Sequence, residues 1–215
     1  MAQLFVGIGT GPGMGMSTAS RFARGGFDLV LASTNTAKLE PLATELRRST
    51  GRNVETVSLD ATDATAVQHL ADRLADRVEV IHYNAALLGK TGIAETSVQD
   101  FDRHLEVDIT GAFSAIRSFA PGMQARRKGT ILLTGGGYSL APSADYLALS
   151  IGKAGIRSMA QALFKPLAAN GVHIATLTVT RGVTAGSSDA TAVAEGFWQL
   201  HSEPEGDWTW EARLQ

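Results

Sequence analysis

The sequence contains no cysteine, so disulfide bonds, thiolate metal sites and a cysteine nucleophile are excluded. No apolar stretch approaches the roughly 20 residues of a membrane-spanning helix, and no basic segment precedes the first apolar run. The formal net charge is −2, without the clustered lysines and arginines that bind nucleic acid or an anionic membrane. No two of the five histidines have the spacing of a zinc site, so we expect no metal. We therefore expect a cytoplasmic protein that binds a small-molecule substrate, with neither nucleic acid nor membrane as a partner.

Short apolar runs alternate with stretches of helical spacing along the chain. This alternation predicts an α/β fold, a doubly wound (Rossmann-type) parallel sheet in three α/β/α layers. The length of 215 residues suits a single dinucleotide-binding domain over residues 1–215, with a short C-terminal helix and tail from about residue 190. The runs expected to form buried strands are residues 4–8, 29–32, 54–59, 78–82, 130–134 and 172–179.

A glycine-rich segment directly follows the first expected strand and precedes a stretch rich in small residues. The order strand, glycine turn, helix allows backbone N–H groups and the positive end of a helix to approach a diphosphate. Glycines also serve tight turns that bind nothing, which is the alternative for this segment taken alone. The residues expected to contact a nucleotide are Gly9, Gly11, Pro12, Gly13, Met14 and Gly15.

Ligands of such sheets bind at the carboxyl ends of the strands, which makes the residues after each strand candidates for a site. These residues, together with the glycine spacing Gly9-x-x-x-Gly13-x-Gly15, resemble the short-chain dehydrogenase/reductase family over nearly the whole chain. The positions are Asp60 and Ala61, Asn84 and Ala85, the run 134–137, Arg181 with Gly182 and Val183, and Lys153 on a helix expected from about residue 145.

The resemblance implies an oxidoreductase that transfers hydride with a nicotinamide coenzyme. It implies that Asp60 meets the adenine amino group, that Asn84 stabilises the central strands and that Lys153 holds the nicotinamide ribose. Ala61, Ala85, Gly182 and Val183 are expected beside the coenzyme, and Arg181 stands where the family usually has proline.

The usual acid–base residues of the family are missing. The family places a tyrosine four residues before the lysine and a serine thirteen residues before that tyrosine. Counting back from Lys153 gives Leu149 and Gly136 instead. The asparagine that commonly completes the proton relay is replaced by Asp108, judged from the Gly-Ala-Phe sequence that follows it closely.

Four residues remain as catalytic candidates: Lys153, Asp108, Tyr138 and Tyr146. Asp108 and Lys153 are expected to form a buried ion pair that relays a proton through water, with a purely structural pair as the alternative. Tyr146 lies seven residues before Lys153, about 10 Å along a helix, so packing is the expected role. Tyr138 follows the glycine run 135–137, where its phenol could reach over the nicotinamide.

Ser33, Thr34 and Asn35 end the second expected strand, where an acidic residue would repel a 2′-phosphate. No carboxylate is present there and three small polar side chains could bind the phosphate, which favours NADP(H) over NAD(H).

An oxidoreductase with an atypical proton donor is therefore the first functional hypothesis. A nucleotide-binding sensor or partner subunit of the same fold, without dehydrogenase activity, is the second, and a flavodoxin-like domain that binds no dinucleotide is the third. Family members pair through two long helices, here about residues 108–126 and 145–169, which predicts a homo-oligomer, either dimer or tetramer. His82, inside a strand, is expected to be buried and hydrogen-bonded.

Overall fold

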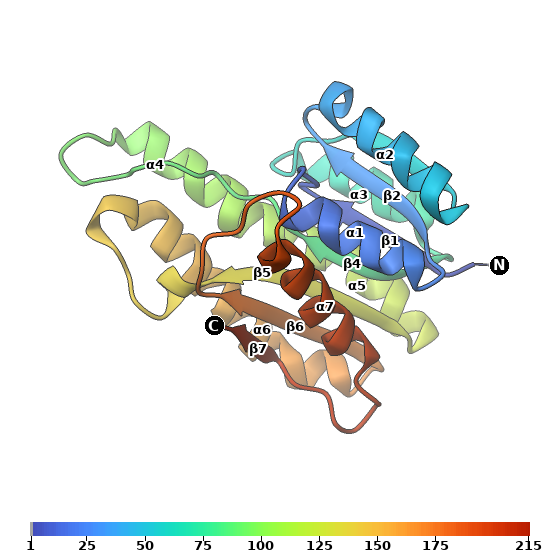
Figure 1. Ribbon diagram of the computed structural model, residues 1–215. Coiled ribbons are helices and arrows are strands. Elements are labelled where there is room, and N and C mark those ends of the chain that lie inside the picture. Colours follow the sequence, from blue (N-terminus) through green and yellow to red (C-terminus); the bar gives the residue numbers. More distant parts are fainter. Residues whose placement is uncertain (1) are drawn as a thin grey trace.

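The computed structural model describes residues 2–215 and contains, within that range, one parallel sheet of seven strands in the order β3-β2-β1-β4-β5-β6-β7 (Figure 1). The predicted doubly wound α/β fold is confirmed, and six strands lie within two residues of their expected bounds. The strands are β1 Leu4–Ile8, β2 Asp28–Ser33, β3 Val54–Ser58, β4 Val78–Tyr83, β5 Gly129–Gly136, β6 Val172–Val179 and β7 Glu211–Leu214.

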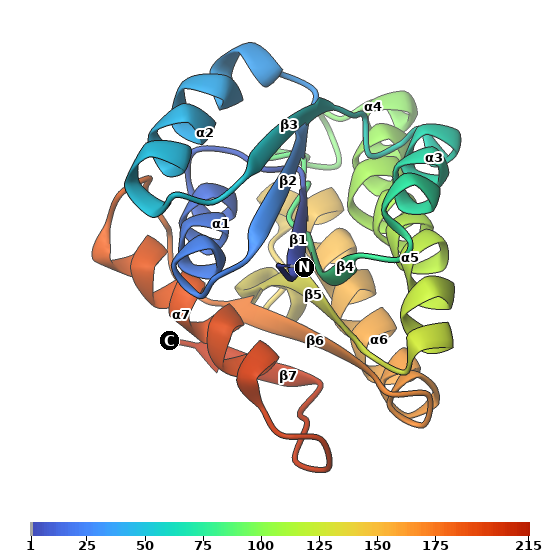
Figure 2. The same cartoon turned by 90° about the vertical axis from the view of Figure 1, so that its right-hand side faces the viewer.

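Helices cover both faces of the sheet and create two separate apolar cores (Figure 2). Successive strand residues point to opposite faces, so Val6 faces one core and Phe5 the other. Helices α1 Met14–Arg24, α2 Thr36–Thr50 and α7 Ser188–Ser202 cover the face of Phe5. Helices α3 Ala64–Leu74, α5 Ala112–Arg126 and α6 Leu147–Ala168 cover the face of Val6.

Local signals set several helix ends. Helix α1 ends at a glycine pair, where Gly25 caps the helix and Gly26 has φ of +99°. Helix α4 Val98–Leu105 begins after Ser97, whose side chain accepts a hydrogen bond from the Asp100 N–H. Both ends agree with the sequence, because these caps need only residues adjacent in the chain.

A π-helical turn, Glu106–Gly111, joins α4 to α5. The sequence predicts one helix from about residue 108, but the helical path begins ten residues earlier and contains this wider turn. A π-turn closes with i→i+5 hydrogen bonds and therefore holds one residue more than an α-turn. It contains Asp108, which is fully buried.

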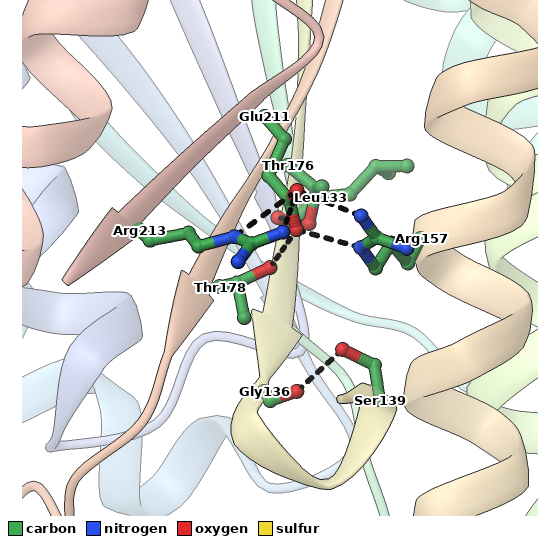
Figure 3. Close-up of polar contacts among 8 residues, drawn as sticks. All are labelled: Leu133, Gly136, Ser139, Arg157, Thr176, Thr178, Glu211 and Arg213. Atoms are coloured by element: carbon green, nitrogen blue, oxygen red, sulfur yellow. Dashed lines mark hydrogen bonds and ion pairs between the residues drawn. The ribbon is translucent and has the colours of Figure 1, made fainter. Parts of the chain in front are cut away.

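The strand β7 was not predicted from the sequence. It extends the sheet beside β6, with Thr176 opposite Glu211 and Val179 opposite Leu214. Figure 3 shows Glu211 between the Arg157 and Arg213 side chains, with the Thr178 hydroxyl also donating to it. These contacts attach β7 to both α6 and β6.

None of the helices in residues 2–215 is long and apolar enough to cross a membrane.

Candidate functional site

A cavity of about 1090 Å³ opens at the carboxyl ends of the central strands. It is the place where parallel α/β sheets bind ligands. The glycine turn after β1 forms one part of the wall. The rest comes from the ends of β2, β3, β4, β5 and β6, from α6 and from residues 103–107. Of the expected coenzyme contacts, the cavity wall includes Gly9, Gly11, Gly13, Met14, Gly15, Ser33, Thr34, Asp60, Ala61, Asn84, Ala85, Lys153, Gly182 and Val183.

The glycine turn has the geometry that a diphosphate requires. Gly9 has φ of +75°, and a Cβ there would lie 2.4 Å from the Ala85 backbone, so this position needs glycine. A Cβ at Gly11 or Gly13 would meet no atom within 4 Å, so both face open space. No side chain of the described chain caps the N-terminus of α1 at Gly13, which leaves its first N–H groups available to an anion. Pro12 belongs to the turn but is absent from the cavity wall.

Two of the three polar residues after β2 reach the cavity. Ser33 and Thr34 line it, whereas the Asn35 side chain accepts a hydrogen bond from the Lys38 N–H and caps α2. Asn35 is absent from the cavity wall, and its contact with the coenzyme stays a prediction. Asp60 accepts hydrogen bonds from the Thr62 backbone and hydroxyl, which lower the pKa of its carboxyl group.

Lys153 extends from α6 into the cavity wall, and its Nζ donates to the Thr134 carbonyl oxygen at 2.9 Å. Only 8% of the residue is exposed, and this burial lowers the pKa of the ammonium group, although Asp108 opposes the shift. Leu149 lies one helical turn earlier and also lines the cavity. A Cβ at Gly136 would lie 3.2 Å from Lys153 Cγ, so the glycine leaves room for the lysine stem.

Asp108 does not form the ion pair that the sequence suggested. Both carboxylate oxygens are buried and have no hydrogen-bond partner among residues 2–215. The reason is geometric, because Lys153 donates to the Thr134 carbonyl instead. Asp108 packs tightly on α6, where a Cβ added at Gly152 would lie 2.6 Å from the Asp108 Cβ. Burial raises the pKa of Asp108 to about 6, although the charge of Lys153 acts to lower it.

The two candidate tyrosines stack on each other. Their ring centroids are 5.3 Å apart with an interplanar angle of 17°. Tyr138 lines the cavity, whereas Tyr146 is absent from its wall. Tyr146 belongs to a short 3-10 turn, Ala144–Tyr146, because α6 begins at Leu147 and not near residue 145 as expected. Tyr138 thus lies nearer to any bound ligand, with Tyr146 behind its ring.

Sequence reasoning missed the side chains at the outer end of the cavity. Leu88 and Leu140 line it while remaining 81% and 40% exposed, and Arg103 and Glu106 of the α4 region also face it. Their positions depend on how two long loops fold, which no local pattern indicates. The run 134–137 was expected at the site, but the sequence did not show that the Thr134 hydroxyl contacts Asn84 Oδ1 and His82 Nε2.

The buried hydrogen-bonded His82 was predicted and is confirmed. Its Nε2 lies 2.8 Å from the Thr134 hydroxyl oxygen, and the residue is fully buried. Burial lowers the pKa of its imidazole to about 3, with a further contribution from the charge of Lys153.

Comparison with known sequences gives matches across most of the chain. A family model described as short chain dehydrogenase matches residues 4–193. Human 17-beta-hydroxysteroid dehydrogenase type 3 is 29% identical over 181 residues, which are 83% of this chain and 58% of that protein. The 1-deoxy-11-beta-hydroxypentalenate dehydrogenase of Streptomyces exfoliatus is 28% identical over 212 residues, covering 95% of this chain and 77% of that protein. The chain spans 52% to 62% of the length of several of its curated relatives.

Solved structures match over nearly the full length. The crystal structure of a short-chain dehydrogenase from Rhodopseudomonas palustris has a TM-score of 0.88 and 29% identity, and the match covers 99% of this chain and 98% of that one. A metagenomic short-chain oxidoreductase solved in complex with NADP also has a TM-score of 0.88, at 22% identity, with 99% of this chain and 96% of that chain covered. At that lower identity the second match concerns the fold alone.

Proposed function

The chain belongs to the short-chain dehydrogenase family, and on that premise we propose that it transfers hydride between a nicotinamide coenzyme and a small carbonyl or alcohol substrate. One observation carries the proposal: the open glycine turn after β1 and the Lys153 side chain from α6 both line the same cavity. A diphosphate at the turn and a ribose at the lysine would place one dinucleotide across the strand ends.

The coenzyme supplies or accepts the hydride when it is bound. The N–H groups at the start of α1 would hold its diphosphate, Asp60 its adenine and Lys153 its nicotinamide ribose. Ser33 and Thr34 offer hydroxyl groups and no negative charge where a 2′-phosphate would lie, which supports NADP(H) over NAD(H). Two curated relatives are named as dehydrogenases, which supports the reaction class.

Tyr138 is the side chain that we propose as the proton donor. It is the one phenol among the described residues of the cavity wall, and Leu149 and Gly136 leave no hydroxyl group at the positions the family uses. Lys153 contributes a cation to the same wall, where it would bind the ribose of the coenzyme. Asp108 is buried and does not line the cavity, so it would act only by raising the pKa of the Lys153 ammonium group.

Apolar side chains in the cavity wall favour a substrate with an apolar group next to the reacting carbonyl. They are Leu88, Leu140, Leu149 and Val183. Burying exposed leucine surface against a substrate would stabilise the complex in proportion to the apolar area removed from water. The names of two relatives, a hydroxysteroid and a hydroxypentalenate dehydrogenase, support the same substrate character.

The experiment is a fluorescence titration with NADPH and NADH, followed by a screen of aldehydes and ketones at high enzyme concentration. We expect NADPH to bind more tightly than NADH and reduction to be fastest with apolar ketones. Leu140→Asn should raise KM for an apolar ketone, whereas Ile93→Asn, a control at an exposed apolar residue outside the cavity, should not. Failure of both coenzymes to bind at millimolar concentration would refute the proposal.

A second candidate is a nucleotide-binding protein of the same fold that catalyses no hydride transfer. The observation that favours it is the apolar Leu149 where the family's acid would stand. Coenzyme binding without turnover of any carbonyl or alcohol in the screen would support this candidate against the first.

A further inference from the structure

A chain of three hydrogen bonds crosses the centre of the sheet below the glycine turn. It begins at His82 on β4, whose Nε2 lies 2.8 Å from the Thr134 hydroxyl oxygen on β5. The Thr134 hydroxyl lies 3.0 Å from Asn84 Oδ1, and the Asn84 Nδ2 donates to the Gly9 carbonyl at 3.0 Å. Gly9 belongs to the glycine turn that lines the cavity.

The donors and acceptors in this chain can be arranged in one way. Asn84 Nδ2 donates to Gly9, so its Oδ1 must accept, and the Thr134 hydroxyl gives its single proton to that oxygen. The Thr134 oxygen then accepts from His82, which places the imidazole proton on Nε2. His82 therefore fixes the rotation of the hydroxyl, and the hydroxyl fixes which way the Asn84 amide faces.

The Thr134 backbone extends the network to the other side of the cavity. Its carbonyl oxygen accepts the hydrogen bond from Lys153 Nζ at 2.9 Å. Thr134 thus contacts the glycine turn through its side chain and Asn84, and the lysine through its main chain. One buried residue links the two parts of the cavity wall that would hold opposite ends of a dinucleotide.

A role in packing alone does not account for the imidazole. His82 is surrounded by apolar groups, with the Phe197 ring centroid 4.5 Å and the Phe5 ring centroid 6.1 Å from its own. Its Nδ1 is buried without a hydrogen-bond partner in the described chain, an unfavourable state that a leucine would avoid. The hydrogen bond to the Thr134 hydroxyl is the one polar contact of the His82 side chain among the described residues.

We propose that His82 and Thr134 are positioning residues that hold the Gly9 carbonyl, through Asn84, so that the N–H groups of the turn point at the coenzyme diphosphate. The inference rests on the proposed function for its ligand and adds two residues that touch neither coenzyme phosphate nor substrate through their side chains. It predicts an effect confined to ligands that carry a diphosphate.

The test compares His82→Leu and Thr134→Val with matched controls from the neighbouring strand. His173→Leu removes another buried histidine, and Thr176→Val removes another buried hydroxyl, both on β6 and outside the cavity wall. Dissociation constants are measured by calorimetry for NADPH, ADP and adenosine. We expect His82→Leu and Thr134→Val to weaken NADPH and ADP about tenfold and adenosine less than twofold. The controls should change none of the three.

Rescue separates positioning from packing. His82→Gln places an amide N–H near the position of Nε2 and should restore ADP binding to within about threefold of the unmodified protein. Equal weakening of adenosine and ADP, or unchanged ADP binding in His82→Leu, would overturn the inference while leaving the proposed function intact. If the unmodified protein binds neither NADPH nor ADP, the proposed function fails and this inference fails with it.

Nitrogen NMR of the unmodified protein provides a readout that does not depend on ligand or on the folding of any variant. We expect the His82 ring to be neutral between pH 5 and pH 8, with its proton on Nε2 and protected from exchange. A proton on Nδ1 would contradict the proposed direction of the hydrogen bonds.

Discussion

Tyr138 and Tyr146 are two phenols in contact, of which one faces the cavity. This difference provides a paired test at the scale of single residues. We expect Tyr138→Phe to reduce kcat at least tenfold with an unchanged dissociation constant for NADPH, because the hydroxyl is proposed to act only in the chemical step. Tyr146→Phe keeps the stacked ring and should leave kcat within about twofold. Steady-state kinetics with a calorimetric control for coenzyme binding would check both, and equal losses in the two variants would exclude Tyr138 as the donor.

Asp108 is a carboxyl group that the folded chain keeps from water. Burial raises its pKa from 3.8 to about 6, so the folded state binds its proton more tightly than the unfolded state does. Its contribution to stability is therefore fully present below pH 3.8 and is lost as the pH rises through about 6. We expect Asp108→Asn, which resembles the protonated acid, to raise the free energy of unfolding at pH 8 by about 3 kcal/mol and to have little effect near pH 4.

Urea denaturation at pH 4.5, 6 and 8 would measure this change. Asp207→Asn, at an exposed carboxyl group, is the control and should show no such trend. A loss of stability at pH 8 in Asp108→Asn would mean that the charged carboxylate is favourable where it lies.

Individual site residues could be predicted from the sequence where their position follows from the end of a strand. Asp60 and Asn84, each directly after a strand, face the cavity as expected, and Lys153 faces it from α6. The ion pair of Asp108 with Lys153 was predicted but does not form, because the position of Asp108 depends on a π-turn and on its close approach to Gly152. Sequence spacing determines which face of a helix a residue occupies, but not which charged group forms an ion pair with it.

At the scale of elements, β7 shows what a local pattern cannot reveal. Its sequence, Glu-Ala-Arg-Leu, has two charged residues in four and lacks the apolar run that marks the other strands. The strand forms because partners distant in the sequence satisfy it: Arg157 from α6 donates to Glu211 at 2.8 Å and 3.0 Å, and Thr178 donates from β6 at 2.8 Å. The other six strands needed no such partners and were predictable from their apolar runs.

The same carboxylate leads to a prediction about the edge of the sheet. Burial acts to raise the pKa of Glu211, but hydrogen bonds from Arg157, Thr178 and Arg213 outweigh it and lower the pKa to about 2. The stabilisation is therefore present above pH 4.5 and is lost as the pH falls toward 2. We expect Glu211→Gln to lower the free energy of unfolding at pH 7 by about 2 kcal/mol, with the difference shrinking below pH 4.5.

Thermal unfolding followed by circular dichroism at pH 3, 5 and 7 would measure the loss. Glu205→Gln, at an exposed position in the loop before β7, should unfold like the unmodified protein. An equal loss for Glu211→Gln at every pH would mean that packing, and not charge, attaches this strand.

At the scale of the whole molecule, the outer surfaces of α5 and α6 carry apolar side chains in contact with water. Phe113 is 53% exposed and Ile151 is 39% exposed. We propose that these helices form the contact between subunits of a homo-oligomer, which would remove both side chains from water. Light scattering after gel filtration should give the mass of a dimer or tetramer.

The double variant Phe113→Lys with Ile151→Lys should shift that mass to the monomer, because a charge on each helix would have to be buried at the contact. Ile93→Lys replaces an apolar residue that is 89% exposed but lies on neither helix, and should leave the mass unchanged. A monomer at micromolar concentration for the unmodified protein would refute the prediction.

The π-turn between α4 and α5 makes one wall of the cavity depend on chain length as well as on chemistry. Glu106 and Val107 of this turn, and Arg103 just before it, face the cavity. Because the wider turn holds one residue more than an α-turn, deleting one residue between positions 106 and 111 would close it as ordinary α-helix and leave the helices on either side nearly in phase. The side chains of α4 would keep their directions, whereas Glu106, Val107 and the buried Asp108 would change position, so the extra residue determines what this part of the wall presents to the cavity.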